Sequence, residues 1–286
     1  MSNKVYLNGE FLAQEEAKIS PMDRGFLFGD GIYEVVPCYD TKPVGLGLHL
    51  ARMNRGLSEI SLNYKAELSE WTDIIQTLIK QFDRAAVSVY IHISRGCDVK
   101  RYHAYPQNIA PTVFAYAFEI SPSQSVDINK TKTYTVATGE DKRWQRCHIK
   151  STSLLGNVMH FQQGQDAGKD EIILFNENGM LTEAAACNVF VVKDGLIMTP
   201  KLDNQLLPGI TRDIALEAMR REGGFTVSEQ DISLETLRTA DEVWLTSSSK
   251  EIGPVVQVDD RIINGGKPGP IWQKAQATYN KYKFKL

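Results

Sequence analysis

Apolar residues recur every three or four positions along two early stretches of the chain. Leu50, Met53, Leu57 and Ile60 follow this spacing within 49–60, and it is stronger within 69–82. Such a period places the apolar side chains on one face of a helix, so both stretches are predicted to be amphipathic helices. Ser69 is a plausible N-cap of the second. Further helices are expected over 153–166, 210–222, 233–238 and 271–281.

Alternation of apolar and other residues predicts strands elsewhere. Val87, Val89, Ile91 and Ile93 alternate with other residues, which indicates a strand with one face in a core. Asn8-Gly9 separates two short apolar runs and predicts a hairpin, because both residues tolerate a positive φ. The remaining strands are expected over 32–36, 111–120, 133–138, 171–175, 188–192, 196–199, 225–227, 242–246 and 255–258.

Strands and helices mix without strict alternation, so an α+β fold is more consistent with this order than a doubly wound parallel sheet. The polar segment 121–125 contains a proline and separates two strand runs, which makes it the best candidate for a linker. The expected domains are therefore a smaller N-terminal domain over 1–120 and a larger C-terminal domain over 121–286.

Composition narrows the class of protein. The chain has 286 residues, 42% hydrophobic and 23% charged, with a net charge of -3. These values are ordinary for a globular protein, and the balance of charge argues against a nucleic-acid partner. No apolar run suits a membrane span or a signal peptide. The four cysteines lie far apart, which predicts reduced thiols and a cytoplasmic location.

Several common site motifs are missing from the sequence. It contains no Walker loop, no Gly-x-Gly-x-x-Gly and no Gly-x-Ser-x-Gly. The five histidines show no paired metal-binding spacing, so no metal site is expected. Serine-hydrolase, dinucleotide and zinc chemistries therefore have no local support.

Four segments together indicate a site for a cofactor that carries an aldehyde, a ring nitrogen and a phosphate. Lys150 lies between an apolar residue and small polar residues at an apparent helix start, where a neutral amine would react with an aldehyde to form a Schiff base. Glu183 lies among small residues and would pair with a protonated ring nitrogen. Segments 207–212 and 246–249 combine hydroxyls with a helix start or a strand end and would hold a phosphate. Each signal is weak alone, but together they form the set that pyridoxal phosphate requires.

With these motifs the chain resembles fold-type IV pyridoxal-phosphate aminotransferases, and among them the branch that acts on D-amino acids. The resemblance extends over nearly the whole chain. Its strongest stretches are Asp23–Val36, Arg143–Leu155, Thr182–Phe190, Gly209–Asp213 and Thr246–Val255. Several ordered motifs over this span make the similarity specific.

The resemblance implies a role for each matching residue. Lys150 would form the Schiff base, Glu183 would contact the pyridine nitrogen and Arg52 would bind the phosphate. The cofactor-binding residues would further include Leu207 on the ring and, in the phosphate loops, Ile210, Thr211, Ser247 and Ser248. The residues that would recognise the substrate are Tyr33, Arg101 and His103.

The resemblance also implies an activity and an assembly. The expected reaction is transamination between a D-amino acid similar to D-alanine and a 2-oxo acid such as 2-oxoglutarate or pyruvate. The cofactor would lie between the two domains. Arg101 and His103 would come from the other subunit of a homodimer.

Departures from the family keep alternatives open. The loop that contains Arg101 and His103 is one residue longer than the family's form, and Lys100 is a rival carboxylate binder. A branched-chain aminotransferase would carry a Gly-x-Arg after the Tyr33-Glu34 pair, but Val35 follows here. An (R)-amine transaminase differs mainly in the longer loop and remains an alternative.

Overall fold

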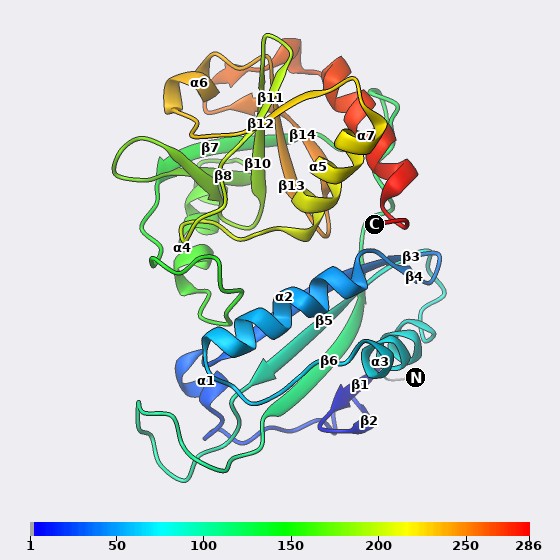
Figure 1. The fold of residues 1–286 in the computed structure, drawn as a ribbon, viewed down its shortest axis with the longest axis vertical. Coiled ribbons are helices and arrows are strands. Elements are labelled where there is room, and N and C mark those ends of the chain that lie inside the picture. The colour runs from blue at the N-terminus through cyan, green and yellow to red at the C-terminus, as the bar shows by residue number, and fades with distance from the viewer. Residues whose placement is uncertain (1–2) are drawn as a thin grey trace. The chain divides into compact units, whose positions relative to one another are not determined.

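The computed structural model describes residues 3–286, which divide into two compact units. The first unit runs to Pro122 and also contains the later segment Ile149–Leu154. The second unit comprises Ser123–His148 and Leu155–Leu286. Both units combine helices with a mixed or antiparallel sheet, which confirms the predicted α+β class (Figure 1).

The first unit is built on a six-stranded antiparallel sheet. Its strands follow the order β2-β1-β6-β5-β3-β4. They are β1 (Lys4–Leu7), β2 (Glu10–Ala13), β3 (Gly31–Tyr39), β4 (Lys42–Pro43), β5 (Ala86–Ser94) and β6 (Thr112–Glu119). The predicted hairpin joins β1 to β2, and Asn8 and Gly9 have φ values of 49° and 100° in its turn.

Two amphipathic helices cover one face of this sheet. They are α2 (Leu46–Glu59) and α3 (Leu68–Ile79), and both occur where the apolar period predicted them. Met53 and Leu57 of α2 and Trp71 and Ile75 of α3 are buried in one core with alternate side chains of β3 and β5. Figure 1 shows α2 lying along the sheet.

Two local predictions for this unit were wrong. Helix α3 begins at Leu68, its N-cap position is Glu67, and no side chain caps it, so Ser69 is already inside the first turn. No helix was expected before residue 49, but Arg24–Phe28 form the short helix α1. Asp23 caps α1 through Oδ1, which accepts from the N–H of Gly25.

The second unit is built on a nine-stranded mixed sheet. Its main order is β12-β11-β10-β13-β14-β7-β8-β9, and β15 pairs with β14. Its strands are β7 (Tyr134–Glu140), β8 (Glu171–Phe175), β9 (Leu181–Ala184), β10 (Asn188–Lys193), β11 (Leu196–Thr199), β12 (Thr226–Glu229), β13 (Glu242–Ser247), β14 (Glu251–Val258) and β15 (Arg261–Ile262). Its helices are α4 (Leu155–Asp166), α5 (Ile210–Glu222), α6 (Leu234–Arg238), the 3-10 helix η1 (Asn264–Gly266) and α7 (Pro270–Tyr282).

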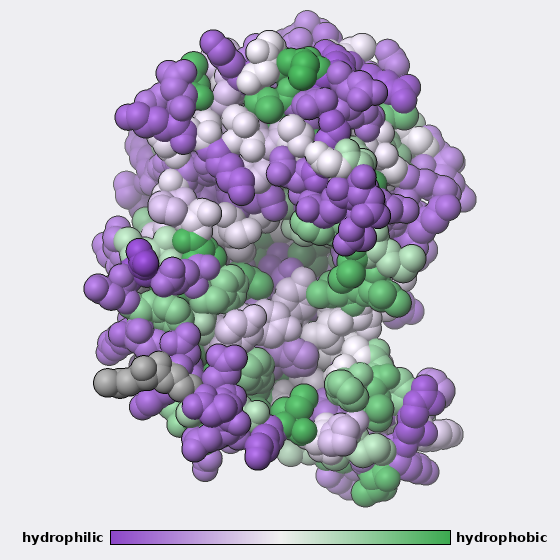
Figure 2. Space-filling model, turned by 180° about the vertical axis from the view of Figure 1, so that it is seen from behind, coloured by the Kyte–Doolittle hydropathy of each residue, from purple (hydrophilic) through white to green (hydrophobic). Residues whose placement is uncertain are grey.

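Helices α5 and α7 pack together and against β13 and β14 (Figure 1). The predicted C-terminal boundary of α5 is confirmed, because Gly223 caps it with a positive φ of 75°. Strand β9 was not predicted, since its four residues are too few to show an alternation and include Glu183 and Ala184, which have low β-propensity. Hydrophilic residues cover much of the face of this unit at the top of Figure 2, and its apolar core is buried.

The segment that contains Lys150 differs from its prediction in two ways. It belongs to the first unit, whereas the predicted boundary assigned Lys150 to the C-terminal domain. The reason is backbone pairing with β3, because the N–H of Tyr33 donates to the Lys150 carbonyl at 3.0 Å and Ser151 pairs with Ile32. The segment is also not a helix start, since α4 begins only at Leu155.

Among residues 3–286, no helix is long and apolar enough to cross a membrane. All four cysteines lie in this range and are free thiols, three of them buried.

Candidate active site

Lys150 lies on the short extended segment that pairs with β3 in the first unit. Its side chain is half-buried, and Nζ is 4.1 Å from the centre of the Tyr33 ring. A lysine ammonium is attracted to the face of an aromatic ring at this distance. Lys150 and Tyr33, which are 117 positions apart in the sequence (150 − 33), therefore lie in contact.

A buried ion-pair cluster occupies the same unit. Arg52 of α2 donates from Nε and Nη2 to the two carboxylate oxygens of Glu34 on β3, both at 2.7 Å. Nδ1 of His49 is also 2.7 Å from Glu34 Oε2. Glu34 is 0% exposed and His49 1% exposed. This two-point pairing orients the guanidinium of Arg52.

The charges in this cluster follow from burial and pairing. Burial opposes ionisation of Glu34, but the charge of Arg52 and the hydrogen bonds from Arg52 and His49 outweigh it, so the pKa of Glu34 lies well below its usual range. Burial lowers the pKa of His49, despite the opposing effect of Glu34. The cluster is therefore an ionised Arg52–Glu34 pair that a neutral His49 supports.

We expect Glu34→Gln to destabilise the first unit by about 3 kcal/mol or more at pH 7, because it leaves a buried arginine without its counter-charge. A lowered pKa contributes stability above the unfolded-state value of about 4.3, and this contribution is lost as the pH falls further. The difference between wild type and variant should thus be largest at neutral pH and shrink below about pH 4.3. Urea unfolding at several pH values measures it.

Glu59→Gln is the matched control, because Glu59 is an exposed glutamate at the end of α2. It should change the free energy of unfolding by less than about 0.5 kcal/mol. An equal effect of both substitutions would contradict a special role for the buried pair.

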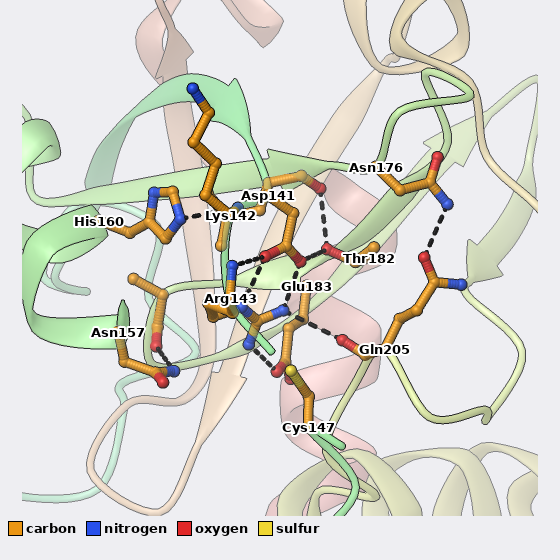
Figure 3. Close-up of polar contacts among 12 residues, drawn as sticks. Asp141, Lys142, Arg143, Cys147, Asn157, His160, Asn176, Thr182, Glu183 and Gln205 are labelled. Carbon is orange, nitrogen blue, oxygen red and sulfur yellow. Dashed lines mark hydrogen bonds and ion pairs between the residues drawn. The ribbon is translucent and has the colours of Figure 1, made fainter. Parts of the chain in front are cut away.

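Glu183 is the central residue of a second cluster, in the second unit (Figure 3). It lies on β9 and is 6% exposed. Arg143 Nη1 donates to its Oε1. Asn188 Nδ2 and the N–H of Leu207 donate to its Oε2, each at 3.1 Å. The carboxylate is thus fixed in place by three donors.

Arg143 is itself held by a second acid. Its Nε and Nη2 donate to Asp141 at 3.0 and 2.7 Å, and Nη2 also donates to the Gln205 carbonyl at 3.1 Å (Figure 3). Burial opposes ionisation of Asp141, but hydrogen bonds and charge from Arg143 lower its pKa. Asp141 therefore stays ionised and shares the charge of Arg143 with Glu183.

Burial raises the pKa of Glu183 above its usual value, although the charge of Arg143 and the N–H of Leu207 oppose the shift. A buried carboxylate with a raised pKa binds a proton more strongly than an ordinary glutamate does. The three donors to this carboxylate favour its ionised form, and an ionised carboxylate is the form that stabilises a proton on a neighbouring ring nitrogen.

The start of α5 lies close to the end of β13. Gly209 precedes the helix, and a Cβ there would lie 1.9 Å from Asn188 Oδ1, so the close approach requires glycine. Asn188 pairs with Thr246 in the sheet. Thr246 Oγ1 is buried and has no hydrogen-bond partner among the described residues. The first backbone N–H groups of a helix also lack intrahelical acceptors, so donors without an acceptor in the helix lie at this point.

The hydroxyls predicted for the phosphate loops lie around this point. Thr211 is buried in the first turn of α5. Ser247 ends β13, and its Oγ accepts from the N–H of Lys250 at 3.2 Å. Ser248 follows directly and is half-buried. Ile210 is the first residue of α5 and is buried.

The two predicted carboxylate binders lie on an exposed loop of the first unit. The guanidinium of Arg101 lies 5.0 Å from the centre of the Phe28 ring, and the ring centre of His103 lies 5.3 Å from it. Lys100, the rival candidate, lies over Tyr102 instead, 4.9 Å from its ring centre. Arg101 and His103 therefore share a neighbour that Lys100 lacks.

Sequence reasoning missed five residues of these clusters, namely Glu34, His49, Asp141, Arg143 and Asn188. The spacing of His49 and Arg52, three positions apart on one side of α2, was the available signal for the first cluster. Arg143 and Asn188 lie within the ordered motifs but carry no periodic signal. Within residues 3–286, no group of three or more metal-binding side chains occurs.

Comparison with known proteins agrees with the family that the sequence motifs indicate. The family model "Amino-transferase class IV" matches residues 31–258. The D-alanine aminotransferase of Staphylococcus haemolyticus is 36% identical over 281 residues, which cover 98% of this chain and 97% of that protein. The D-alanine aminotransferase of Bacillus licheniformis is 34% identical over 96% of this chain and 94% of that protein.

Solved structures share the fold at lower identity. The branched-chain amino acid aminotransferase of Escherichia coli has a TM-score of 0.89 and 24% identity, covering 99% of this chain and 95% of that chain. The branched-chain aminotransferase of Thermoproteus uzoniensis has a TM-score of 0.85 and the same identity and coverage. At this identity the likeness establishes the fold alone.

Proposed function

Because the chain belongs to the class IV aminotransferase family, we propose that it exchanges an amino group between a D-amino acid similar to D-alanine and a 2-oxo acid, with pyridoxal phosphate as cofactor. The observation that carries this proposal is the 36% identity, over 98% of the chain, to a D-alanine aminotransferase. The two charged clusters and Lys150 supply the residues that such a reaction needs.

The donor set of the chain fits pyridoxal phosphate. Thr246 Oγ1 is a buried hydroxyl without a partner among the described residues, and it lies beside the start of α5, where backbone N–H groups favour a phosphate. We propose that Ile210, Thr211, Ser247, Ser248 and Arg52 bind the phosphate. Glu183 would contact the ring nitrogen and Leu207, whose N–H donates to Glu183, would pack on the ring.

Each charged residue has a distinct proposed task. Lys150 would carry the cofactor through Nζ and, when free, would take the proton from the substrate α-carbon as a general base. Glu183, as an ionised carboxylate held by Arg143, Asn188 and the N–H of Leu207, would stabilise a proton at the ring nitrogen. When bound, pyridoxal phosphate supplies an electron sink for the pair of electrons left on the α-carbon. The ring of Tyr33 lies beside Nζ of Lys150 and would limit the positions of this group.

Substrate recognition would depend on Tyr33, Arg101 and His103. A guanidinium and an imidazole are suitable partners for a carboxylate, and both side chains lie on an exposed loop against the same ring. We further propose a homodimer in which this loop serves the active site of the other subunit, and a cytoplasmic location.

A panel of amino donors tests the proposed function. Purified protein is given D-alanine, L-leucine or (R)-1-phenylethylamine, each with pyruvate or 2-oxoglutarate as acceptor (D-alanine only with 2-oxoglutarate), and the keto product is measured. We expect the highest kcat/KM with D-alanine. Turnover of L-leucine alone would overturn the proposal in favour of a branched-chain aminotransferase, and turnover of the arylamine alone would favour an (R)-amine transaminase.

A further inference from the structure

The short helix α1 is joined to both ends of the loop formed by residues 95–111. The N–H of Arg24 donates to the Gly96 carbonyl at 2.9 Å. The carboxylate of Asp23 accepts from Ser94 Oγ at 2.7 Å and from Thr112 Oγ1 at 2.5 Å. One capped helix thus anchors the points where this loop leaves and rejoins the sheet.

The side chain of Arg24 reaches the middle of the same loop. Arg24 is only 3% exposed. Its Nη1 donates to the Tyr102 carbonyl at 2.5 Å and its Nη2 to the His103 carbonyl at 3.3 Å. Its Nε donates to Asp30 at 2.8 Å. A rigid guanidinium fork therefore fixes two successive carbonyls directly after Arg101.

The ring of Phe28, also in α1, contacts the side chains that this backbone carries. The guanidinium of Arg24 lies 4.8 Å from the ring centre. Arg101 and His103 lie at 5.0 and 5.3 Å from the same centre. Contacts of cations and aromatic groups with a ring limit the orientations that the two exposed side chains adopt.

A second arginine supports the acid that holds Arg24. Arg95 donates to both oxygens of Asp30, from Nε at 2.8 Å and from Nη2 at 3.0 Å, and also to the Ile60 carbonyl at 2.7 Å. Burial opposes ionisation of Asp30, but the two arginines lower its pKa, so it stays a carboxylate. Asp30 therefore keeps a charged partner when Arg24 is replaced, and such a substitution leaves no buried charge alone.

We infer that Arg24 is a positioning residue for substrate recognition, which fixes the backbone at 102–103 so that Arg101 and His103 are oriented to bind the substrate carboxylate. This inference rests on the proposed function, in which those two side chains bind that group. Within residues 3–286 the side-chain hydrogen bonds of Arg24 go to the loop and to Asp30, and none goes to Lys150, so its expected effect is on affinity for a carboxylate and not on proton transfer.

The kinetic test uses Arg24→Met and Arg24→Lys, with Arg55→Met as control because Arg55 is an exposed arginine on α2. We expect KM for D-alanine to rise about tenfold or more in Arg24→Met while kcat stays within about twofold, since a ground-state contact is weakened. Arg24→Lys keeps a charge beside Asp30 but lacks the fork and should lie between. Equal loss in kcat, or an unchanged KM, would overturn the inference.

A second measurement tests the loop without any substrate. Lys100 and Arg101 are exposed trypsin sites within the loop, so the rate of cleavage after them reports how firmly the backbone is held. We expect cleavage at least about tenfold faster in Arg24→Met than in wild type or Arg55→Met. Cleavage at the wild-type rate would overturn the inference. If wild type turns over no D-amino acid, the proposed function fails, and the protease result still decides whether Arg24 holds the loop.

Discussion

Replacement of Lys150 by alanine is expected to reduce turnover by about 10³-fold or more, because the variant loses the general base at the α-carbon. It also loses the amine that would carry the cofactor, so the visible absorbance of the bound cofactor should change in purified protein. The contacts of Glu183, Asn188 and Leu207 do not involve Lys150, so the fold of the second unit should be preserved. Steady-state rates and absorbance spectra provide the measurements.

Lys142→Ala is the control for this substitution, since Lys142 is 70% exposed and only eight positions away (150 − 142). It should leave both the rate and the spectrum unchanged. A Lys150→Ala enzyme with activity within tenfold of wild type would assign the role of Lys150 to another amine.

The second large effect is expected for Glu183→Gln, which should lower kcat by about 10- to 100-fold, the range of a lost charge-assisted hydrogen bond. Glutamine has the shape of glutamate but cannot hold a proton at the ring nitrogen as a carboxylate does. Its side-chain oxygen can still accept from Asn188 and from the N–H of Leu207, and Arg143 keeps Asp141 as a partner. The loss should therefore appear in kcat more than in stability.

Glu177→Gln provides the comparison, because Glu177 is exposed in the turn between β8 and β9. Rates and thermal unfolding are measured for both variants. If Glu183→Gln keeps the wild-type kcat, Glu183 has no part in the electronic step. If it unfolds at a much lower temperature than Glu177→Gln, its main role is to pair with Arg143.

Local sequence patterns were sufficient to predict most of the helices and strands. The apolar period of α2 and α3 and the glycine after α5 each depend on residues within one or two turns, so they are readable from the chain. Helix α1 was missed because five residues give no period to recognise, and its cap comes from Asp23 within a glycine-rich run. Strand β9 was missed because its pairing with β8, rather than its composition, makes it a strand.

The residues of the candidate site could be predicted from the sequence, but their surroundings could not. Lys150, Glu183 and the two phosphate segments are recognisable because each lies in a short ordered motif, and their roles remain predictions for the experiments above. The surroundings of these residues were not predictable. Arg52 resembles a solvated helix residue until Glu34 is brought to it, and Arg143 resembles one of several basic residues until Glu183 is brought to it.

The sequence by itself determined the α+β class, most helices and strands, and the ordered motifs of a class IV aminotransferase, because these depend on neighbouring residues. Only the tertiary structure decided that Lys150 belongs to the first unit, that Arg52 pairs with a glutamate 18 positions away and that Arg143 pairs with one 40 positions away. It also decided that Arg24 holds a loop 78 positions further on. The physical reason is that burial and charge pairing depend on contacts between distant segments, and local periodicity carries no information about those contacts.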